Sequence, residues 1–404
     1  MKTEKLMIYI LLSLVLFLVL IMSFSVYMRL KPPESVVLVA FRMPYQMLSH
    51  YLTITCGVGV ILYMAFILIK HCKPERYALF LGSGFAVCCM MGVIYSMRIW
   101  GATAKVSGMK YQKTMKENVQ YEVQIEDLHE QRKVSQCSLF TPTGSPYEKN
   151  LVVYLNYGGW SAQDEKMGTY LQELVTDAGY SYVRFVGTEK EQGNITDIVK
   201  SVKGNLNLLV EERQYEKVVL IGGSAGGNIA LITTFSNDDQ DIFGEAFPVD
   251  GVIALYPMTD MESAYEYFVE QAEATSFLGK LGDKLYCGLY GNDSGTRTFA
   301  GETKKLDEAV FGEKQSEDSL YKKASVLNLV GEQNIPTLMI GGNADSMVVV
   351  EDNRKMYEYM KSKGMDCAYL ELPNVEHAFD IVDNTARRRT CVEIEKWLDT
   401  VFSK

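Results

Sequence analysis

The sequence has little of what marks several common classes of protein. It carries 40 Lys and Arg residues against 50 Asp and Glu residues, and its formal net charge of −10 is unevenly spread. Residues 1–100 hold nine basic and three acidic side chains, so the other 304 residues carry a net charge of −16. A chain this acidic is a poor match for a phosphate backbone. Nucleic-acid binding is therefore set aside.

Motifs for metals and cofactors are missing as well. None of the eight cysteines lies in a C-x-x-C or Cys/His ligand spacing, so we expect no structural zinc site. The sequence contains no P-loop, no dinucleotide-binding fingerprint after a strand and no cluster of metal ligands. We therefore expect neither a cofactor nor a metal.

Long uncharged runs are present, and they lie near the N-terminus. Residues 6–28, 51–69 and 77–97 contain no charged side chain, and a bilayer core of about 30 Å needs roughly 20 apolar residues per helix. They predict three transmembrane helices in a membrane region over 1–104, with the lipid bilayer as a partner. The positive-inside rule favours a cytoplasmic C-terminal domain, because that orientation places eight rather than five Lys and Arg in the cytoplasm. The predicted location is a multi-pass integral membrane protein.

From residue 119 onward, short β-branched runs alternate with helical segments. We expect strands at 119–125, 134–140, 151–155, 182–186, 218–221, 251–256, 337–340 and 367–372. We expect helices at 164–178, 195–212, 225–234, 350–363 and 387–401. Apolar strands between helices predict an α/β fold with a mostly parallel sheet that is covered on both faces. The segment 258–330 interrupts the alternation, so it is expected to form a cap within a domain over 105–404.

A candidate nucleophile follows the predicted strand 218–221. Gly222-Gly223-Ser224-Ala225-Gly226 fits G-x-S-x-G, directly after a buried strand and directly before a helix. A serine hydroxyl is a weak nucleophile, so it must be held clear of the sheet and beside a base. The sharp turn does this, and Gly222 and Gly226 relieve crowding where the backbone folds back. Ser224 is therefore the predicted nucleophile.

The base and the acid are sought among the residues that follow. Of four histidines, only His377 comes after the serine, in a loop just past the last predicted strand, where it can reach the sheet edge that carries Ser224. Asp345 lies just after strand 337–340, and a carboxylate there would fix the imidazole tautomer and stabilise the imidazolium. Among the competing carboxylates, Glu351 and Asp352 fall further into the predicted helix. Glu376 adjoins the histidine and is expected to point elsewhere.

Acyl transfer also needs hydrogen-bond donors for the developing oxyanion. The backbone N–H of Ala225, the residue after the nucleophile, is one candidate. Gly158 and Gly159, in the turn after strand 151–155, are the others, because glycine lets the backbone approach a substrate oxygen without a Cβ in the way. These three residues form the predicted oxyanion hole.

Four stretches taken together resemble the hormone-sensitive-lipase-like esterase branch of the α/β-hydrolases. They are 152–160, with its Gly158-Gly159-Trp160 turn, then 223–228, 335–345 and His377-Ala378-Phe379, and the resemblance covers about residues 119–404. The chain order Ser, Asp, His is that of the α/β-hydrolases. The resemblance implies an α/β-hydrolase fold and carboxylic-ester hydrolysis through an acyl-enzyme. It also implies a triad of Ser224, Asp345 and His377, with Gly158, Gly159 and Ala225 as oxyanion hole.

The sequence departs from that branch at two places. The branch's H-G-G-G becomes Asn156-Tyr157-Gly158-Gly159, and the usual acid before the serine is Gly223. The first change is expected to narrow the acyl pocket or to add a phenol donor, so it bears on the substrate class more than on catalysis.

The sequence as a whole predicts a membrane-anchored serine hydrolase that acts on a small-molecule or lipid ester. An acyltransferase or deacetylase on a lipid-linked or glycan substrate would use the same acyl-enzyme, and product analysis with competing alcohols separates it. A catalytically inactive membrane scaffold is the non-enzymatic alternative, and a peptidase stays open because the same triad cleaves amides.

Overall fold

The protein is described by a computed structural model. It describes residues 90–403 apart from 109–119, 164–167, 188–193, 275–276, 278, 281–297 and 317.

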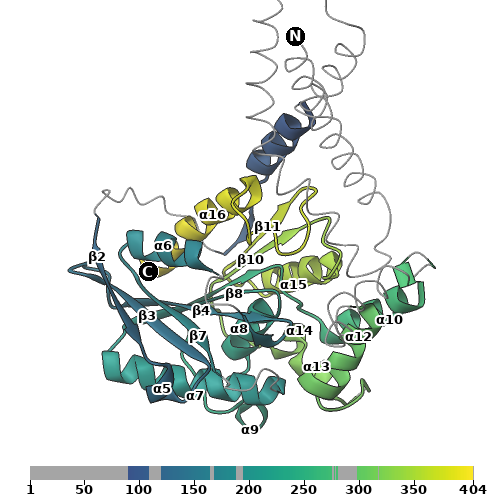
Figure 1. Cartoon of the computed structure of the whole chain (residues 1–404), viewed down its shortest axis with the longest axis horizontal. Helices are drawn as coiled ribbons and strands as arrows, with labels where there is room; N and C mark the ends of the chain where they lie inside the picture. Colours follow the sequence, from purple (N-terminus) through teal and green to yellow (C-terminus); the bar gives the residue numbers. More distant parts are fainter. Residues whose placement is uncertain are drawn as a thin grey trace, which may run out of the picture.

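A nine-stranded sheet forms the centre of the molecule, in the order β1-β11-β10-β9-β8-β4-β7-β3-β2 (Figure 1). The strands from β11 to β7 are parallel, and antiparallel β1 closes one edge while β3 and β2 close the other. Their bounds are β1 Lys105–Ser107, β2 Glu122–Asp127, β3 Gln136–Thr143, β4 Asn150–Leu155, β7 Ser181–Val186, β8 Lys217–Gly223, β9 Gly251–Leu255, β10 Thr337–Gly342 and β11 Cys367–Leu372. A two-stranded hairpin, β5 (Tyr157–Gly158) and β6 (Ser161–Ala162), follows β4.

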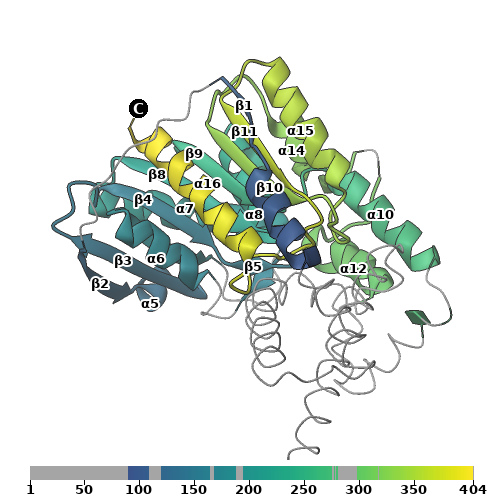
Figure 2. The same cartoon turned by 90° about the horizontal axis from the view of Figure 1, so that it is seen from above.

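Helices cover both faces of this sheet, which explains why its inner strands are apolar throughout. In β4, Leu151, Val153 and Leu155 belong to one core cluster, whereas Val152 and Tyr154 belong to the other. The first cluster includes α7 (Ile195–Arg213), α8 (Ala225–Phe235) and α15 (Val350–Ser362). The second includes α6 (Thr169–Asp177), α16 (Thr385–Phe402) and the helix at 90–101 (Figure 2). Two further short helices are α5 (His129–Arg132) and α9 (Gln240–Phe243).

The segment between β9 and β10 contains the region predicted to be a cap. Its helices are α10 (Met261–Ala274), α12 (Phe299–Lys305), the π-helix η3 (Leu306–Val310), α13 (Leu320–Ala324) and α14 (Val326–Leu329). They lie together at one side of the molecule, drawn in green in Figure 1. The described part of this segment has no strand, as the loss of alternation predicted. Its role as a cap, like the domain boundaries, stays a prediction.

The N-terminal part of the sequence-based prediction needs correction. Within the residues that the structure describes, no helix has both the length and the apolar character needed to cross a bilayer. Runs 6–28 and 51–69, and 77–89 of the third run, lie outside the described residues. The three predicted spans and the multi-pass membrane location are therefore not retained, and the fold class is corrected to an α/β fold with a mostly parallel sheet.

Candidate active site

Ser224 lies in a tight turn between β8 and α8. Its φ of 54° places a non-glycine residue in the left-handed region, where backbone strain occurs mostly at functional sites. The flanking glycines leave no room for side chains. A Cβ on Gly222 would lie 2.2 Å from the backbone carbon of Gly226, and a Cβ on Gly226 would lie 2.4 Å from the carbonyl oxygen of Leu155. The turn therefore has the close backbone approach that the G-x-S-x-G spacing predicts.

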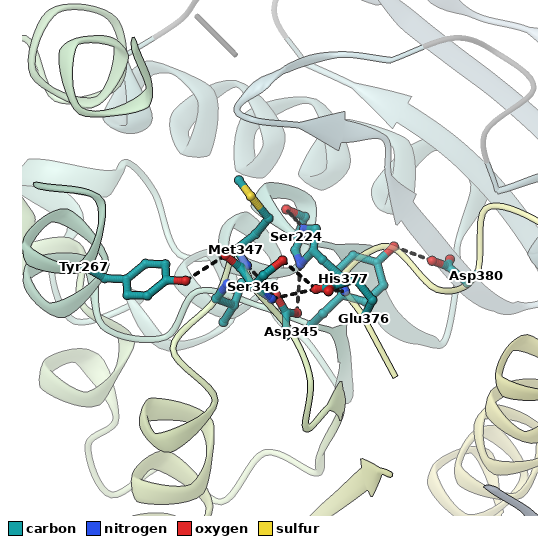
Figure 3. Close-up of polar contacts among 10 residues, drawn as sticks. Ser224, Tyr267, Asp345, Ser346, Met347, Glu376, His377 and Asp380 are labelled. Atoms are coloured by element: carbon teal, nitrogen blue, oxygen red, sulfur yellow. Dashed lines mark hydrogen bonds and ion pairs between the residues drawn. The ribbon is translucent and has the colours of Figure 1, made fainter. Parts of the chain in front are cut away.

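The structure brings together the three side chains predicted as nucleophile, base and acid (Figure 3). His377 Nε2 lies 3.0 Å from Ser224 Oγ, and His377 Nδ1 lies 2.9 Å from Asp345 Oδ2. The other carboxylate oxygen of Asp345 accepts hydrogen bonds from the backbone N–H groups of Met347 (2.8 Å) and Val348 (2.9 Å). Only 12% of the His377 side chain and 3% of the Asp345 side chain are exposed. Water therefore has little access to the His–Asp contact.

The surroundings of His377 raise the pKa of its imidazole above the ordinary value. Burial acts in the opposite direction and is the largest single influence, because it disfavours the charged form. The charge and hydrogen bond of Asp345 outweigh it, with further contributions from the charges of Glu376 and Asp380. The imidazolium is thus stabilised at this position.

Glu376 links the loop of Asp345 to the loop of His377. Its side chain is fully buried, and Oε1 accepts hydrogen bonds from Ser346 N (2.6 Å), Ser346 Oγ (2.7 Å) and His377 N (3.0 Å). Tyr267 of α10 donates a further bond to the Ser346 carbonyl at 2.8 Å (Figure 3). Sequence reasoning gave Glu376 no role, because nothing in the sequence shows that Ser346 lies beside it.

The two other carboxylates that were weighed for the acid point into different contacts. Glu351 accepts a hydrogen bond from Arg354 at 2.9 Å, and Asp352 accepts one from Lys355 at 3.2 Å. All four residues belong to α15. Neither carboxylate therefore takes the place of Asp345 beside the imidazole.

Tyr256 occupies the space that an acidic residue before the serine would need. A Cβ on Gly223 would lie 2.7 Å from the Tyr256 hydroxyl oxygen and 3.1 Å from its Cζ. The hydroxyl donates to the buried carboxylate of Asp380, which also accepts from Tyr170 at 2.6 Å. The Tyr256 ring meets the His377 imidazole edge-on, with centroids 4.7 Å apart. The absence of a side chain at Gly223 thus leaves room for Tyr256, which pairs with Asp380 and borders His377.

The predicted oxyanion turn is the β5–β6 hairpin. Gln163, which the sequence did not single out, donates to the carbonyls of Gly158 (3.1 Å), Ser161 (3.2 Å) and Ala162 (3.2 Å). Trp160 Nε1 donates to Asn228 Oδ1 of α8 at 3.1 Å, which ties the hairpin to the helix that starts at Ala225. These contacts hold the turn beside the start of α8, where the backbone N–H of Ala225 is the third predicted oxyanion donor.

The residues that replace the family's histidine and first glycine serve as anchors for this turn. Asn156 is fully buried, and its amide donates to Gln136 Oε1 at 3.0 Å. Tyr157 is buried in the core, and its hydroxyl accepts a hydrogen bond from the N–H of Gly187 at 2.7 Å. The phenol that was expected as an extra donor is thus held at the end of β7.

A metal centre has no candidate here: across the described stretches, no three His, Cys, Asp or Glu side chains are grouped so that they could hold an ion.

Comparisons with known proteins point to one fold. A family model described as alpha/beta hydrolase fold matches residues 194–381. The chain is 20% identical over 195 residues to esterase LipQ of Mycobacterium tuberculosis, a match that covers 46% of this chain and 38% of that protein. The chain thus spans well under half the length of this curated relative. A crystal structure of an esterase/lipase from an uncultured bacterium is 14% identical, with a TM-score of 0.50, and covers 77% of this chain and 91% of that one. Esterase 2 of Thermogutta terrifontis phosphorylated by paraoxon is 17% identical, with a TM-score of 0.46, over 71% of this chain and 96% of that one.

The family match covers the elbow, the loop of Asp345 and the loop of His377, and the sheet order places all three at the carboxyl ends of parallel strands. The resemblance predicted from the motifs is confirmed at the level of the fold: residues 194–381 match the alpha/beta hydrolase fold.

Proposed function

We propose that this α/β-hydrolase is a carboxylic-ester hydrolase that uses Ser224 as nucleophile. The observation that carries the proposal is the continuous hydrogen-bonded chain from Ser224 Oγ through His377 to Asp345, at 3.0 and 2.9 Å. A serine is activated when an adjacent base takes its proton and a third group orients that base. The chain has this arrangement on a strained turn, where the hydroxyl is held clear of the sheet.

The proposed reaction proceeds in two halves. Ser224 Oγ attacks the ester carbonyl carbon while its proton passes to His377 Nε2, and the N–H groups of Gly158, Gly159 and Ala225 stabilise the oxyanion. The tetrahedral intermediate collapses, the alcohol leaves with the proton from His377, and the acyl group stays on Ser224. Water then attacks the acyl-enzyme and gives one proton to His377. When this second intermediate collapses, the bond to Ser224 Oγ breaks, His377 returns the proton to Oγ, and the carboxylic acid leaves.

The substrate class rests on the relatives. The curated relative is named an esterase, and the solved structure with a TM-score of 0.50 is titled an esterase/lipase. Both names support a small-molecule ester. No residue of the proposed reaction needs a cofactor.

The test is covalent labelling of the full chain with an active-serine phosphonate probe. We expect rapid labelling of the native protein and none of Ser224→Ala, with kcat/KM on a 4-nitrophenyl ester lowered by about 10⁴-fold or more in the variant. Ser346→Ala is the matched control, because Ser346 lies at the site but is hydrogen-bonded to Glu376 rather than to His377.

A native protein that resists the probe and cleaves no ester, while circular dichroism shows it folded, would refute the proposal. It would support a catalytically inactive hydrolase domain instead.

A further inference from the structure

A lysine of the segment between β9 and β10 lies over the proposed oxyanion turn. Lys305 is the last residue of α12, and its Nζ lies 3.0 Å from the position that a Cβ on Gly159 would take. Gly159 has a φ of 52°, a conformation that side chains rarely adopt, and Lys305 Nζ is the neighbouring atom that faces its Cβ position. A cation from a separate part of the chain therefore stands next to a proposed donor to the reacting carbonyl.

The neighbouring charges are already engaged elsewhere. Lys304 forms an ion pair with Glu308 at 3.8 Å, and both side chains are largely exposed. Asp307 accepts hydrogen bonds from Tyr321 (2.8 Å) and Tyr265 (3.4 Å). Lys305 itself is half-buried and forms no ion pair with any residue in the described part of the chain. Among the described residues, no acidic side chain therefore neutralises its charge.

The backbone holds Lys305 in this position. Phe299, at the start of α12, is 2% exposed and packs against Tyr267 and Phe268 of α10, with ring centroids 6.1 and 6.0 Å apart. Helical bonding then changes from α to π directly after Lys305, at η3. Short π-helices are rare and occur often at functional sites. The position of Lys305 is therefore set by the packing of α12 and by the change from α to π hydrogen bonding that follows it.

We propose that Lys305 is a specificity-determining residue that binds an anionic group of the substrate, so that the preferred esters carry a carboxylate or similar anion close to the scissile carbonyl. This inference rests on the proposed ester hydrolysis at Ser224. A lysine ammonium gives charge-assisted hydrogen bonds to such a group, and these are about twice as strong as neutral ones. The effect is local, because the residues beyond the first 100 carry a net charge of −16 and would otherwise disfavour an anionic substrate.

The test compares matched esters that differ in one charge. On the acyl side these are the 4-nitrophenyl monoester of adipic acid and the same molecule with its free carboxylate methylated. On the alcohol side they are 4-carboxyphenyl acetate and its methyl ester. The quantity measured is the ratio of kcat/KM for the anionic member to kcat/KM for the neutral member, with the full chain. We expect a ratio of about ten or more for at least one pair, and the pair that shows it locates the anion on the acyl or the alcohol side.

Lys305→Met should bring that ratio down by about tenfold, and Lys305→Arg should retain most of it. Lys304→Met is the control, since it removes the adjacent charge and should leave the native ratio. Equal ratios in native protein and Lys305→Met would overturn the inference, whether both rates fall together or neither changes. If the native protein cleaves neutral esters and reacts with the phosphonate, that failure leaves the proposed function standing. A native protein inert to both would overturn the two together.

Discussion

Three carboxylates around His377 position its imidazole and stabilise the charged form. Asp345 contacts Nδ1 directly, Glu376 binds the backbone N–H of His377 itself, and Asp380 holds the tyrosine that lies edge-on to the ring. Their charges together raise the pKa of His377 against the opposing effect of burial. Because His377 must be neutral to accept the serine proton in the proposed reaction, we expect the acid limb of the kcat/KM profile to lie at a higher pH than for an ordinary histidine.

The variant Glu376→Gln tests whether the charge of Glu376 contributes to the raised pKa of His377. The amide keeps an oxygen that can accept from Ser346 and from His377 N, but it removes a negative charge. The pKa of His377 should therefore fall, and the acid limb of kcat/KM should move to lower pH. The measurement is kcat/KM on a neutral ester over about pH 5 to 9, where a histidine base titrates.

Ser346→Ala is the control for this experiment, because it removes one hydrogen bond to Glu376 without changing a charge. The acid limb of its kcat/KM profile should lie at the same pH as in the native protein. An unmoved limb in Glu376→Gln would show that Glu376 acts on the loops alone and has no electrostatic effect on the base.

At the scale of elements, the strand–turn–helix around Ser224 depends on missing side chains. Gly226→Ala places a Cβ 2.4 Å from the carbonyl oxygen of Leu155, so either the helix or β4 must shift. We expect a loss of about 2 kcal/mol or more in the free energy of unfolding, measured by urea titration. Gly204→Ala in α7 is the matched control. It lies exposed in a helix interior with no atom within 4 Å of the new Cβ, and it should stabilise by about 0.4–1 kcal/mol. Similar effects of the two substitutions would contradict a tight elbow.

The same elements show what could be foreseen from the sequence. The strands of the inner sheet were predicted nearly to the residue, because a strand buried on both faces leaves a continuous apolar run, as at Leu151 to Leu155. The hairpin of β5 and β6 and the edge strand β1 have two or three residues each, too few to show a period. The contact of Tyr256 with Asp380 joins residues 124 positions apart. No local pattern records such a pair, although the glycine at 223 was a sign that something else fills that space.

The three residues of the proposed triad could be predicted from the sequence, whereas the residues that hold their loops in place could not. Ser224, Asp345 and His377 each follow a strand, so the common edge of a parallel sheet brings them together. Gln163 and Glu376 act through backbone groups that only the folded loops place within reach. Lys305 comes from a segment without a recognisable period, and its approach to Gly159 depends on how that segment packs.

At the scale of the whole molecule, one side of the helix at 90–101 is part of the second core cluster of the sheet fold. Tyr95 and Ile99 are buried in the cluster that includes α6 and α16, whereas Met97 is 68% exposed. Arg389 of α16 also donates to the carbonyl of Ala102 at 3.0 Å. The sequence of the uncharged run 77–97 did not predict this packing. No polar residue lies four positions from Tyr95 to distinguish an exposed face of the helix from a buried one. A fragment that begins at residue 105, the predicted boundary, would lack Ile99. The apolar side chains that Ile99 packs against would then be exposed to water.

The variant Ile99→Ala measures how far this helix stabilises the sheet fold. Removing a fully buried isoleucine leaves a cavity, and we expect a loss of about 2–4 kcal/mol in the free energy of unfolding of the full chain. Met97→Ala, two residues earlier on the exposed side of the same helix, should change it by no more than about 0.5 kcal/mol. Phosphonate labelling of Ser224 under native conditions should persist in both variants, because neither residue belongs to the proposed triad or oxyanion hole. If Ile99→Ala proved as mild as Met97→Ala, residues 90–101 would be an appendage of the hydrolase rather than part of its second core, and the fold would begin at β1.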